Sequence, residues 1–307
     1  MSRCRKVDVV LGAVFGYDFP ALAPFVLSLQ RGGFEGETVL LGSGLHSDTV
    51  STLQQQGVRV EPIRYRGSGA MNSWSRFWAK LAPIVRRMPS PLARKVIKNL
   101  SCFQTARFFH YLDYLSANRS RFRNVFLTDV RDVYFQRSPF ALAPSDMHGI
   151  RVYEEDPSVP IGEETLFNAP WIRGLFGDDA LNEIAHCPVI CSGTILGDID
   201  SIIDFLTAFT SLAQRARELS VVGEDQGIHN YLCRTEFGRD RRVEVVPNGG
   251  GEVFTFVHFA GDSHSLNSDG DFTVRSGGVV PVLHQYDRVP EIERELLERL
   301  ACTPCIE

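Results

Sequence analysis

The sequence lacks any run of about 18 apolar residues, so we expect no membrane-spanning helix in its 307 residues. It has neither a G-x-G-x-x-G motif nor a G-x-x-x-x-G-K-[ST] motif, which argues against a dinucleotide dehydrogenase and a P-loop nucleotidase. The seven cysteines are odd in number and irregularly spaced, which argues against a disulfide framework and suits a reducing, cytoplasmic compartment. The net charge of −5 gives no reason to expect nucleic acid as a partner.

Acidic residues are absent from one long window of this acidic protein, between Pro62 and Leu112. The basic residues in the window are Arg64, Arg66, Arg76, Lys80, Arg86, Arg87, Arg94, Lys95, Lys98 and Arg107. Two interpretations are open, a solvated helical face or a surface that binds phosphates, an anionic acceptor or an anionic membrane. The second interpretation predicts peripheral membrane contact through residues 64–98.

The first part of the chain alternates between strand and helix patterns. We interpret the apolar run Val7–Val14 as a buried strand rather than a signal peptide, because Asp8 interrupts it and no small-residue cleavage site follows. The next expected elements are a helix at Ala21–Gln30, a strand at Thr38–Leu41, a helix capped by Ser47 or Asp48 and ending near Gln56, and a strand at Val58–Ile63. This order predicts the α/β class, with three α/β/α layers around a mostly parallel sheet.

The rest of the chain continues the pattern with one irregular stretch, Met71–Leu100, whose three prolines predict two or three short helices. Further helices are expected at Phe103–Leu115, Ile199–Leu219, Gly223–Cys233 and Pro290–Leu300. Further strands are expected at Phe122–Thr128, Gly149–Tyr153, Pro188–Leu196, Val243–Val246, Val253–Phe259 and Val279–His284. No repeat or low-complexity linker interrupts the chain, so we expect a single domain over residues 1–307.

Two acids, Asp129 and Asp132, follow the apolar strand Phe122–Thr128 directly. Ligands of open α/β sheets bind at the carboxyl ends of the strands, and two carboxylates there suit Mn²⁺ or Mg²⁺ if a third ligand joins them. The alternative is a strand-end turn in which Asp129 caps the next segment. Among the late histidines, His284 is favoured over His258 as the third ligand, because a polar, turn-like segment follows it.

Two further motifs place polar residues beside apolar segments. Ser192 and Gly193 interrupt an apolar strand, which indicates either a β-bulge or close approach of a ligand to the backbone. Glu224 and Asp225 begin a helix, where acids either complement the helix dipole or act on a substrate hydroxyl.

The first strand ends in the turn from Ala13 to Asp18. Tyr17 is a candidate to stack on a nucleobase, with the backbone of Ala13 and Phe15 reading the edge of the base. The alternative is an ordinary strand-end turn with a half-buried tyrosine.

Together, the segments FLTDVRDVYFQRSPF, CSGTILG, EDQGIHNYL and VLHQYDR resemble the motifs of GT-A glycosyltransferases, and the resemblance extends from Val7 to Arg288. By position, Asp129 and Asp132 resemble the D-x-D metal acids of that family, Asp225 resembles its acceptor-side acid, and His284 resembles its late metal-binding histidine. The spacing here is D-x-x-D, so either both acids or Asp132 alone would contact the metal.

The resemblance implies transfer of a hexosyl or related group, the EC 2.4 class, from a UDP- or GDP-sugar to a glycan, lipid-linked or small-molecule acceptor. Residues 1–140, with the basic helical segment 64–100, would bind the nucleotide, and residues 141–307 would bind sugar and acceptor. The expected donor-site side chains are Arg76, Arg107, Arg131, Ser192 and Gly193, with Asp225 or Glu224 facing the acceptor. Because the metal acids lie on another segment, a change at Asp225 is expected to leave donor binding nearly unchanged.

Two other function classes are compatible with parts of the sequence. An apolar strand followed by paired aspartates also begins haloacid-dehalogenase-type sugar-phosphate phosphatases, although there the acids occur early in the chain as D-x-D. A non-catalytic protein that binds nucleotide-sugars is the second alternative. Turnover of a donor would separate the transferase from the binder, and phosphate release would identify the phosphatase.

Overall fold

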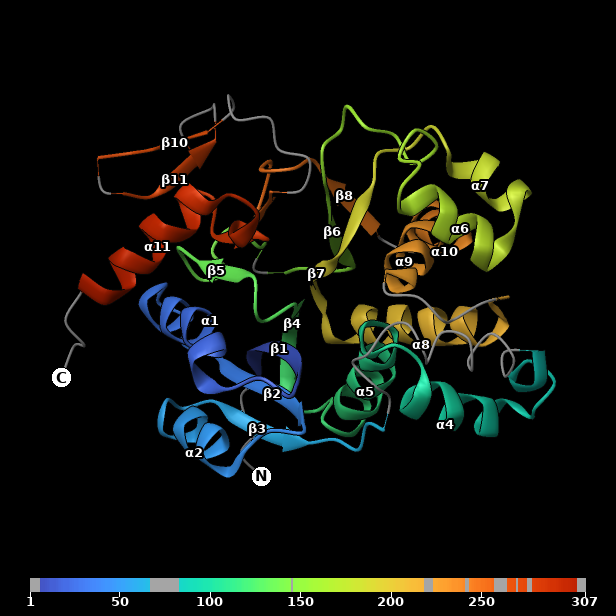
Figure 1. Cartoon of the computed structure of the whole chain (residues 1–307), viewed down its shortest axis with the longest axis horizontal. Coiled ribbons are helices and arrows are strands. Elements are labelled where there is room, and N and C mark those ends of the chain that lie inside the picture. Colours follow the sequence, from blue (N-terminus) through green and yellow to red (C-terminus); the bar gives the residue numbers. More distant parts are fainter. Residues whose placement is uncertain are drawn as a thin grey trace.

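The computed structural model describes residues 6–66, 83–144, 146–217, 223–240, 243–256, 264–268, 270–274 and 278–302. Its centre is a seven-stranded sheet in the order β3-β2-β1-β4-β7-β6-β8 (Figure 1). The strands are β1 (Val7–Phe15), β2 (Glu37–Ser43), β3 (Arg59–Pro62), β4 (Phe122–Thr128), β6 (Ile150–Glu154), β7 (Ile190–Asp198) and β8 (Val243–Val246). Only β7 of these seven runs antiparallel to its neighbours, so the predicted α/β class with a mostly parallel sheet is confirmed.

The sheet is buried on both faces, because alternate residues of its strands enter two separate cores. Val9 and Leu11 of β1 belong to one core, and Val10 and Val14 of the same strand belong to the other. This alternation follows from the two-residue period of a β-strand and creates the three layers.

The first face is covered by the helices α4 (Ser90–Leu100), α5 (Phe103–Ala117), α8 (Ile199–Arg215) and α9 (Glu224–Arg234). Phe108 of α5 stacks on Phe209 of α8 with ring centroids 4.0 Å apart, which fixes these two helices against each other. Asp198 ends β7 and caps α8, since its carboxylate accepts hydrogen bonds from the amides of Asp200 and Ser201.

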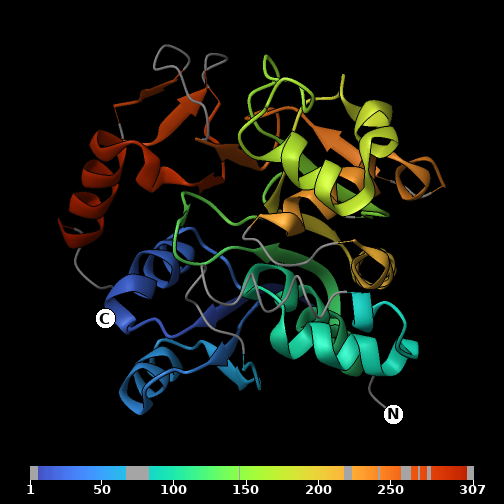
Figure 2. The ribbon, with the colours of Figure 1, turned by 45° about the vertical axis from the view of Figure 1, so that its right-hand side comes forward.

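The second face is covered by α1 (Phe19–Arg31), by α2 (Ser47–Gln55) and by a small sheet in the order β5-β12-β9. The strands of the small sheet are β5 (Val133–Phe135), β9 (Val253–Thr255) and β12 (Val282–His284). A third core joins this sheet to the hairpin of β10 (His264–Leu266) and β11 (Phe272–Val274), to the turn η1 (Tyr286–Arg288) and to α11 (Pro290–Cys302). In both ribbon views these red elements lie beside α1, away from the teal helices α4 and α5 (Figures 1 and 2).

Residues 155–189 form a lobe between the end of β6 and the start of β7. Backbone hydrogen bonds close its base, from the Glu155 amide to the Val189 carbonyl (2.9 Å) and from the Ile161 amide to the Cys187 carbonyl (2.8 Å). The lobe contains α6 (Asn168–Phe176) and α7 (Asp178–Ile184) and has its own buried core. The short helix α10 (Glu236–Asp240) follows α9 and leads toward β8.

The expected elements are present where the structure describes them, with differences at their ends and in number; residues 71–82, 218–219 and 257–259 of the expected elements lie outside the described residues. The N-cap of α2 is His46 without a side-chain cap bond, so the expected cap at Ser47 or Asp48 is wrong; both residues are already helical. The sequence patterns did not indicate α6, α7, β5, β10 or β11, and the late strand expected at Val279–His284 is shorter. Among the described residues, no helix has both the length and the apolar character needed to cross a membrane.

Candidate active site

Asp129 lies at the carboxyl end of β4, where the chain leaves the sheet. Its amide donates a hydrogen bond to the Gly193 carbonyl (2.7 Å), which ties the end of β4 to the start of β7. Its carboxylate forms an ion pair with Arg107 and lies 3.4 Å from His284 Nε2. The Asp129 side chain therefore bonds to Arg107 and lies beside His284 instead of capping the following segment, which was the alternative interpretation.

Asp129, Asp132 and His284 offer one ligand atom each, and these three atoms lie within 4.8 Å of one another. A cation bonded to its ligands at about 2.1 Å holds neighbouring ligand atoms about 3 to 4 Å apart, so a small contraction of this group would let all three atoms bind one cation. Two carboxylate oxygens and one imidazole nitrogen form a donor set that suits Mn²⁺, and Mg²⁺ with its waters. The described residues contain no second group of this kind.

The ring of His284 is fixed by residues that the motifs did not indicate. His284 is fully buried at the end of β12, and its Nδ1 lies 3.4 Å from the Thr255 hydroxyl and 3.5 Å from Cys191 Sγ. Contacts at Nδ1 leave Nε2 to face the carboxylates, which is the orientation a metal-binding imidazole needs.

Gln285, directly after His284, is the one non-glycine residue with positive φ (57°) in the described chain. Its amide donates a hydrogen bond to the Asp132 carbonyl (2.7 Å), so the left-handed backbone joins the histidine strand to the acidic turn. A side chain in this conformation costs roughly 1 kcal/mol or more, and such strain is typical of functional sites.

The electrostatics of the group favour a bound cation. Burial alone would raise the pKa of Asp129, but Arg107 and His284 hold it below its ordinary value. Burial raises the pKa of Asp132, and the charge of Asp129 raises it further. Burial alone would lower the pKa of His284, but Cys191 and the neighbouring carboxylates raise it well above its ordinary value. The cluster therefore attracts positive charge, which a proton or a divalent metal supplies.

Position 193 needs a glycine, because any side chain there would clash with the acidic cluster. A Cβ at this position would lie 2.5 Å from the His284 ring and 2.7 Å from an Asp129 carboxylate oxygen. The pairing of β6 with β7 also shifts register here, with Val152 opposite Ile195 and Tyr153 opposite Cys191. The β-bulge that the sequence left open is therefore present, and it brings the backbone of β7 against the acidic cluster.

Asp225 lies in the first turn of α9 and is 3% exposed. It accepts a hydrogen bond from the Ser192 hydroxyl (3.0 Å) and pairs with Arg107 at 3.3 Å. Burial raises the pKa of Asp225 although Arg107 opposes the rise, so this carboxylate is a stronger base than a surface aspartate. Glu224 is also buried in the same turn.

Contacts before and after its first turn fix the position of α9. Asn230 bonds to both backbone groups of Ile190, accepting from its amide and donating to its carbonyl, each at 2.7 Å. Gly223 precedes the helix with φ of 99°, and a Cβ there would lie 2.2 Å from the Trp171 ring. These contacts place Asp225 at the start of β7.

Arg107 joins the two acidic groups. Its side chain is 9% exposed and contacts Asp129 and Asp225 together. Burial opposes its charge, but the two carboxylates raise its pKa further above the ordinary value. Because Arg107 contacts both carboxylates, it can couple them, and the expectation that a change at Asp225 leaves donor binding nearly unchanged stays a prediction to be measured.

The end of β1 carries an aromatic group. Phe15 packs edge-on against Tyr65 (ring centroids 5.1 Å) and tilted against Phe103 (5.6 Å). Ala13 is buried, and Tyr17 is half-buried against the second core. The sequence patterns did not associate Tyr65 or Phe103 with this end of the sheet.

Three candidates of the sequence analysis remain, and the structure describes one of them, Arg131. Arg131 pairs with Asp287 (2.6 Å) and lies 3.7 Å from an Asp132 oxygen, so it borders the acidic cluster. Arg76 and His258 lie outside the described residues.

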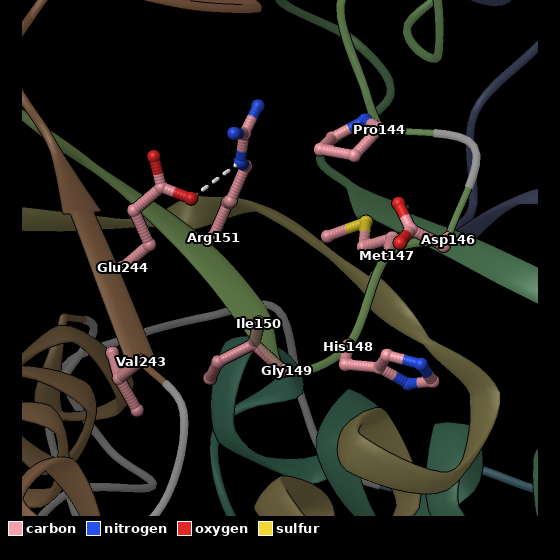
Figure 3. Close-up of a pocket in the computed structure, with 9 residues that line it drawn as sticks. All are labelled: Pro144, Asp146, Met147, His148, Gly149, Ile150, Arg151, Val243 and Glu244. Carbon is pink, nitrogen blue, oxygen red and sulfur yellow. Dashed lines mark hydrogen bonds and ion pairs between the residues drawn. The ribbon is translucent and has the colours of Figure 1, made fainter.

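A cavity of about 420 Å³ lies at the opposite edge of the sheet, where β6 and β8 begin (Figure 3). Two of its charged residues, Arg151 and Glu244, bond to each other at 2.7 Å, whereas its Asp146 and His148 are exposed. This cavity is remote from the acidic cluster, because the two occupy opposite ends of the parallel strands.

No protein-family profile and no curated protein matches the sequence. Solved structures do match. The galactosyltransferase LgtC, crystallised with donor and acceptor sugar analogues, aligns with a TM-score of 0.50 and 14% identity over 96% of this chain and 97% of that one. The bifunctional glycosyltransferase WbbM aligns with a TM-score of 0.55 and 11% identity over 97% of this chain and 50% of that one. The chain therefore has the fold of GT-A glycosyltransferases such as LgtC.

Proposed function

We propose that this protein is a divalent-metal-dependent glycosyltransferase of the EC 2.4 class. It would move a hexosyl or related group from a UDP- or GDP-sugar to a hydroxyl of a glycan, lipid-linked or small-molecule acceptor. The observation that carries the proposal is the convergence of Asp129, Asp132 and His284 at the carboxyl edge of the sheet. In open α/β folds this edge is the usual ligand-binding edge.

The cluster would hold Mn²⁺ or Mg²⁺ through one oxygen of each carboxylate and through His284 Nε2. When bound, such a cation is a Lewis acid that stabilises negative charge on a diphosphate leaving group. Arg107 would orient Asp129 through their ion pair, and Arg131, which pairs with Asp287 beside the cluster, is a candidate to contact a donor phosphate. The aromatic residues at the end of β1 are candidates for the nucleobase, as is Tyr17.

Asp225 would act on the acceptor side. It is buried, its pKa is raised, and it lies across Ser192 from the metal group, so it is suited to orient the acceptor hydroxyl or to take its proton. Ser192 and Gly193 would line the sugar pocket between the two acids. This arrangement supports the assignment of residues 1–140 to the nucleotide and of residues 141–307 to sugar and acceptor.

The two alternative functions receive less support. The phosphatase alternative loses its basis in the fold, because the match to GT-A structures extends over nearly the whole chain. A non-catalytic nucleotide-sugar-binding protein would keep both the fold and the cluster, so only turnover separates it from the transferase.

The first test is a thermal-shift panel of nucleoside diphosphates and UDP- and GDP-sugars, with Mn²⁺, with Mg²⁺ and with a chelator. We expect stabilisation that needs the metal, since a ligand at 100 times its Kd raises stability by about 2.7 kcal/mol. Asp132→Ala should remove the metal-dependent part of the shift and leave the metal-free melting temperature within a few degrees.

Asp146→Ala is a matched control, since Asp146 is an exposed aspartate at the opposite edge of the sheet. The metal assignment is wrong if Asp132→Ala and Asp146→Ala show the same metal dependence as the unaltered protein. Metal-dependent donor binding without donor hydrolysis or transfer, across acceptors of all three classes, would instead establish the non-catalytic binder.

A further inference from the structure

The acid-free window of the sequence corresponds to a locally uncompensated basic surface. Among the described residues, five of its cations form no ion pair, namely Arg64, Arg66, Arg86, Arg87 and Lys95. The part of the window outside the described residues has no aspartate or glutamate that could neutralise them. A solvated face of this kind attracts anions in general, so a specific site needs more structure than charge.

That structure is a cavity of about 480 Å³ between the end of β3 and the helices α4 and α5. Its lining residues are Pro62, Ile63, Arg64, Pro91, Arg94, Lys95, Lys98, Asn99, His110 and Asp113. Asp113 is the only acid among them and forms ion pairs with Arg94 and Lys98. The cavity therefore has four cations and one carboxylate. Because Asp113 pairs with Arg94 and Lys98, the charges of Arg64 and Lys95 are free to bind an anion.

His110 lines the inner side of this cavity. It is 4% exposed, and its Nε2 has no hydrogen-bond partner in the described structure. Burial, with help from Lys98, lowers the pKa of His110 to about 4, so the ring is neutral at pH 7. A buried ring nitrogen without a partner costs about 1 to 3 kcal/mol. Because the neutral ring already bonds to the backbone of Lys98, its Nε2 is an acceptor, and the P–O–H group of a monoprotonated phosphate would supply the missing partner.

We propose that this cavity binds a phosphate monoester. A phosphate presents several acceptor oxygens, and the cavity offers a guanidinium fork from Arg64, an ammonium group from Lys95 and an imidazole from His110. The exposed apolar side chains of Ile84 and Leu92 lie on the same basic segment, 52% and 48% exposed. Apolar side chains among cations favour the headgroup of an anionic lipid over a soluble phosphate as the source.

The site is distinct from the donor site, because none of the residues of the metal cluster lines it. It shares a helix with the donor site, since His110 is three residues beyond Arg107 on α5, a rise of about 4.5 Å along the helix. A phosphate-bearing molecule held here would therefore lie on the same helix that positions Asp129 and Asp225.

The test compares two double variants that remove the same charge from the same segment. Arg64→Ala with Lys95→Ala alters the cavity, whereas Arg86→Ala with Arg87→Ala alters cations that do not line it. Binding of inorganic phosphate is titrated by calorimetry at constant ionic strength, with chloride as the reference anion. Flotation with phosphatidylcholine vesicles, with and without 20% phosphatidic acid, tests the lipid source.

We expect phosphate affinity to fall at least tenfold in the cavity variant and to stay within twofold in the control variant. His110→Phe, which keeps an aromatic side chain but removes both ring nitrogens, should weaken phosphate binding without changing net charge at pH 7. Capture by phosphatidic acid vesicles that is lost in the cavity variant identifies a lipid headgroup, and phosphate binding without capture identifies a soluble phosphate. Equal losses in both double variants, or no preference for phosphate over chloride, would overturn the proposal. Neither measurement requires transferase activity, so the outcome is independent of the proposed function.

Discussion

At the scale of single residues, the site is organised by Arg107. A buried guanidinium is stable only where carboxylates surround it, and Arg107 has Asp129 and Asp225 as partners. Each acid in turn depends on the same cation, so a change at one of them alters the electrostatic surroundings of the other. The acids proposed for the donor and acceptor sides are therefore coupled.

Asp225→Asn tests both the role of this acid and the coupling. Asparagine keeps the size and can still accept from Ser192, but it loses the charge that faces Arg107. We expect transfer to fall on the order of 10²-fold, the usual effect of removing a positioned acid-base group. The apparent affinity for Mn²⁺ should also weaken by about 2- to 10-fold, because Arg107 then pairs with Asp129 alone.

Glu224→Gln is the matched control, being an equivalent change in the same buried turn. Both quantities are measured in the same preparations, as initial rates and as metal titrations of donor binding. Near-normal transfer in Asp225→Asn together with a large loss in Glu224→Gln would assign the acceptor-side role to Glu224. Unchanged metal affinity would show that Arg107 does not transmit the change.

At the scale of elements, the site depends on how α9 and β7 meet. The antiparallel direction of β7 brings its first residues, rather than its last, to the edge where β4 ends. Asn230 then fixes α9 to the backbone of Ile190, so the helix that carries Asp225 and the strand that carries Gly193 form one unit.

Asn230→Leu should separate these two elements. The substitution keeps the volume but leaves the amide and carbonyl of Ile190 without their partners, so we expect a loss of about 2 to 4 kcal/mol in unfolding free energy. Transfer should fall more than donor binding, because the shift occurs at the acceptor side. Chemical denaturation and initial rates of the same variant measure the two effects.

Thr210→Val is a suitable control, since the Thr210 hydroxyl is buried but bonds only to carbonyls of its own helix. It should cost less than about 1.5 kcal/mol and leave transfer unchanged. If Asn230→Leu loses stability but keeps the full ratio of transfer to donor binding, the contact stabilises the fold without positioning Asp225.

Some of the helices and strands could be predicted from the sequence, and others could not. β1, β4 and α5 combine a clear apolar period with turn residues at their ends, and their expected ranges match within a few residues. The lobe 155–189 was missed because Pro170, Gly174 and Gly177 interrupt its helical pattern. Strand direction was not predictable for β7, since the two-residue alternation is the same in both directions.

Part of the candidate site could be predicted from the order of motifs along the chain, and part could not. Motif order along the chain suggested that Asp129, Asp132 and His284 would meet, and the structure brings them together. The contacts of Arg107 with Asp225, and of His284 with Thr255 and Cys191, arise only from how distant segments pack, and no local pattern encodes them.

At the scale of the whole molecule, buried neutral histidines connect stability to pH. His229 is fully buried beside Phe205, and burial, with the charges of Arg234 and Arg107, lowers its pKa to about 3. In the unfolded chain a histidine titrates near pH 6.5. Between these two values the unfolded state binds a proton that the folded state does not.

We therefore expect the unfolding free energy to fall as the pH drops below about 6.5, with a slope of up to about 1.4 kcal/mol per pH unit for His229. His110, whose pKa is lowered to about 4, adds a similar slope down to that value. Urea denaturation at pH 7.5, 6.5, 5.5 and 4.5 measures the effect.

His229→Gln should reduce the slope between pH 6.5 and 4.5, and the exposed His186→Gln should not. A slope that is the same in the parent protein and in His229→Gln would show that protonation of this buried ring does not limit stability in acid.

The lobe 155–189 has a consequence for how such a protein diversifies. Both ends of the lobe lie at the same edge of the sheet, the base is closed by backbone hydrogen bonds, and the lobe has its own core. We therefore expect insertions or deletions within the lobe to leave the strand register of β6 and β7 intact, provided that residues packed on α9 such as Trp171 and Leu175 are kept. The lobe also borders Asp225, since Gln226 bonds to Glu155 and Asn168. Variation in the lobe would therefore change what approaches the proposed acceptor-side acid while leaving the residues of the proposed metal cluster in place.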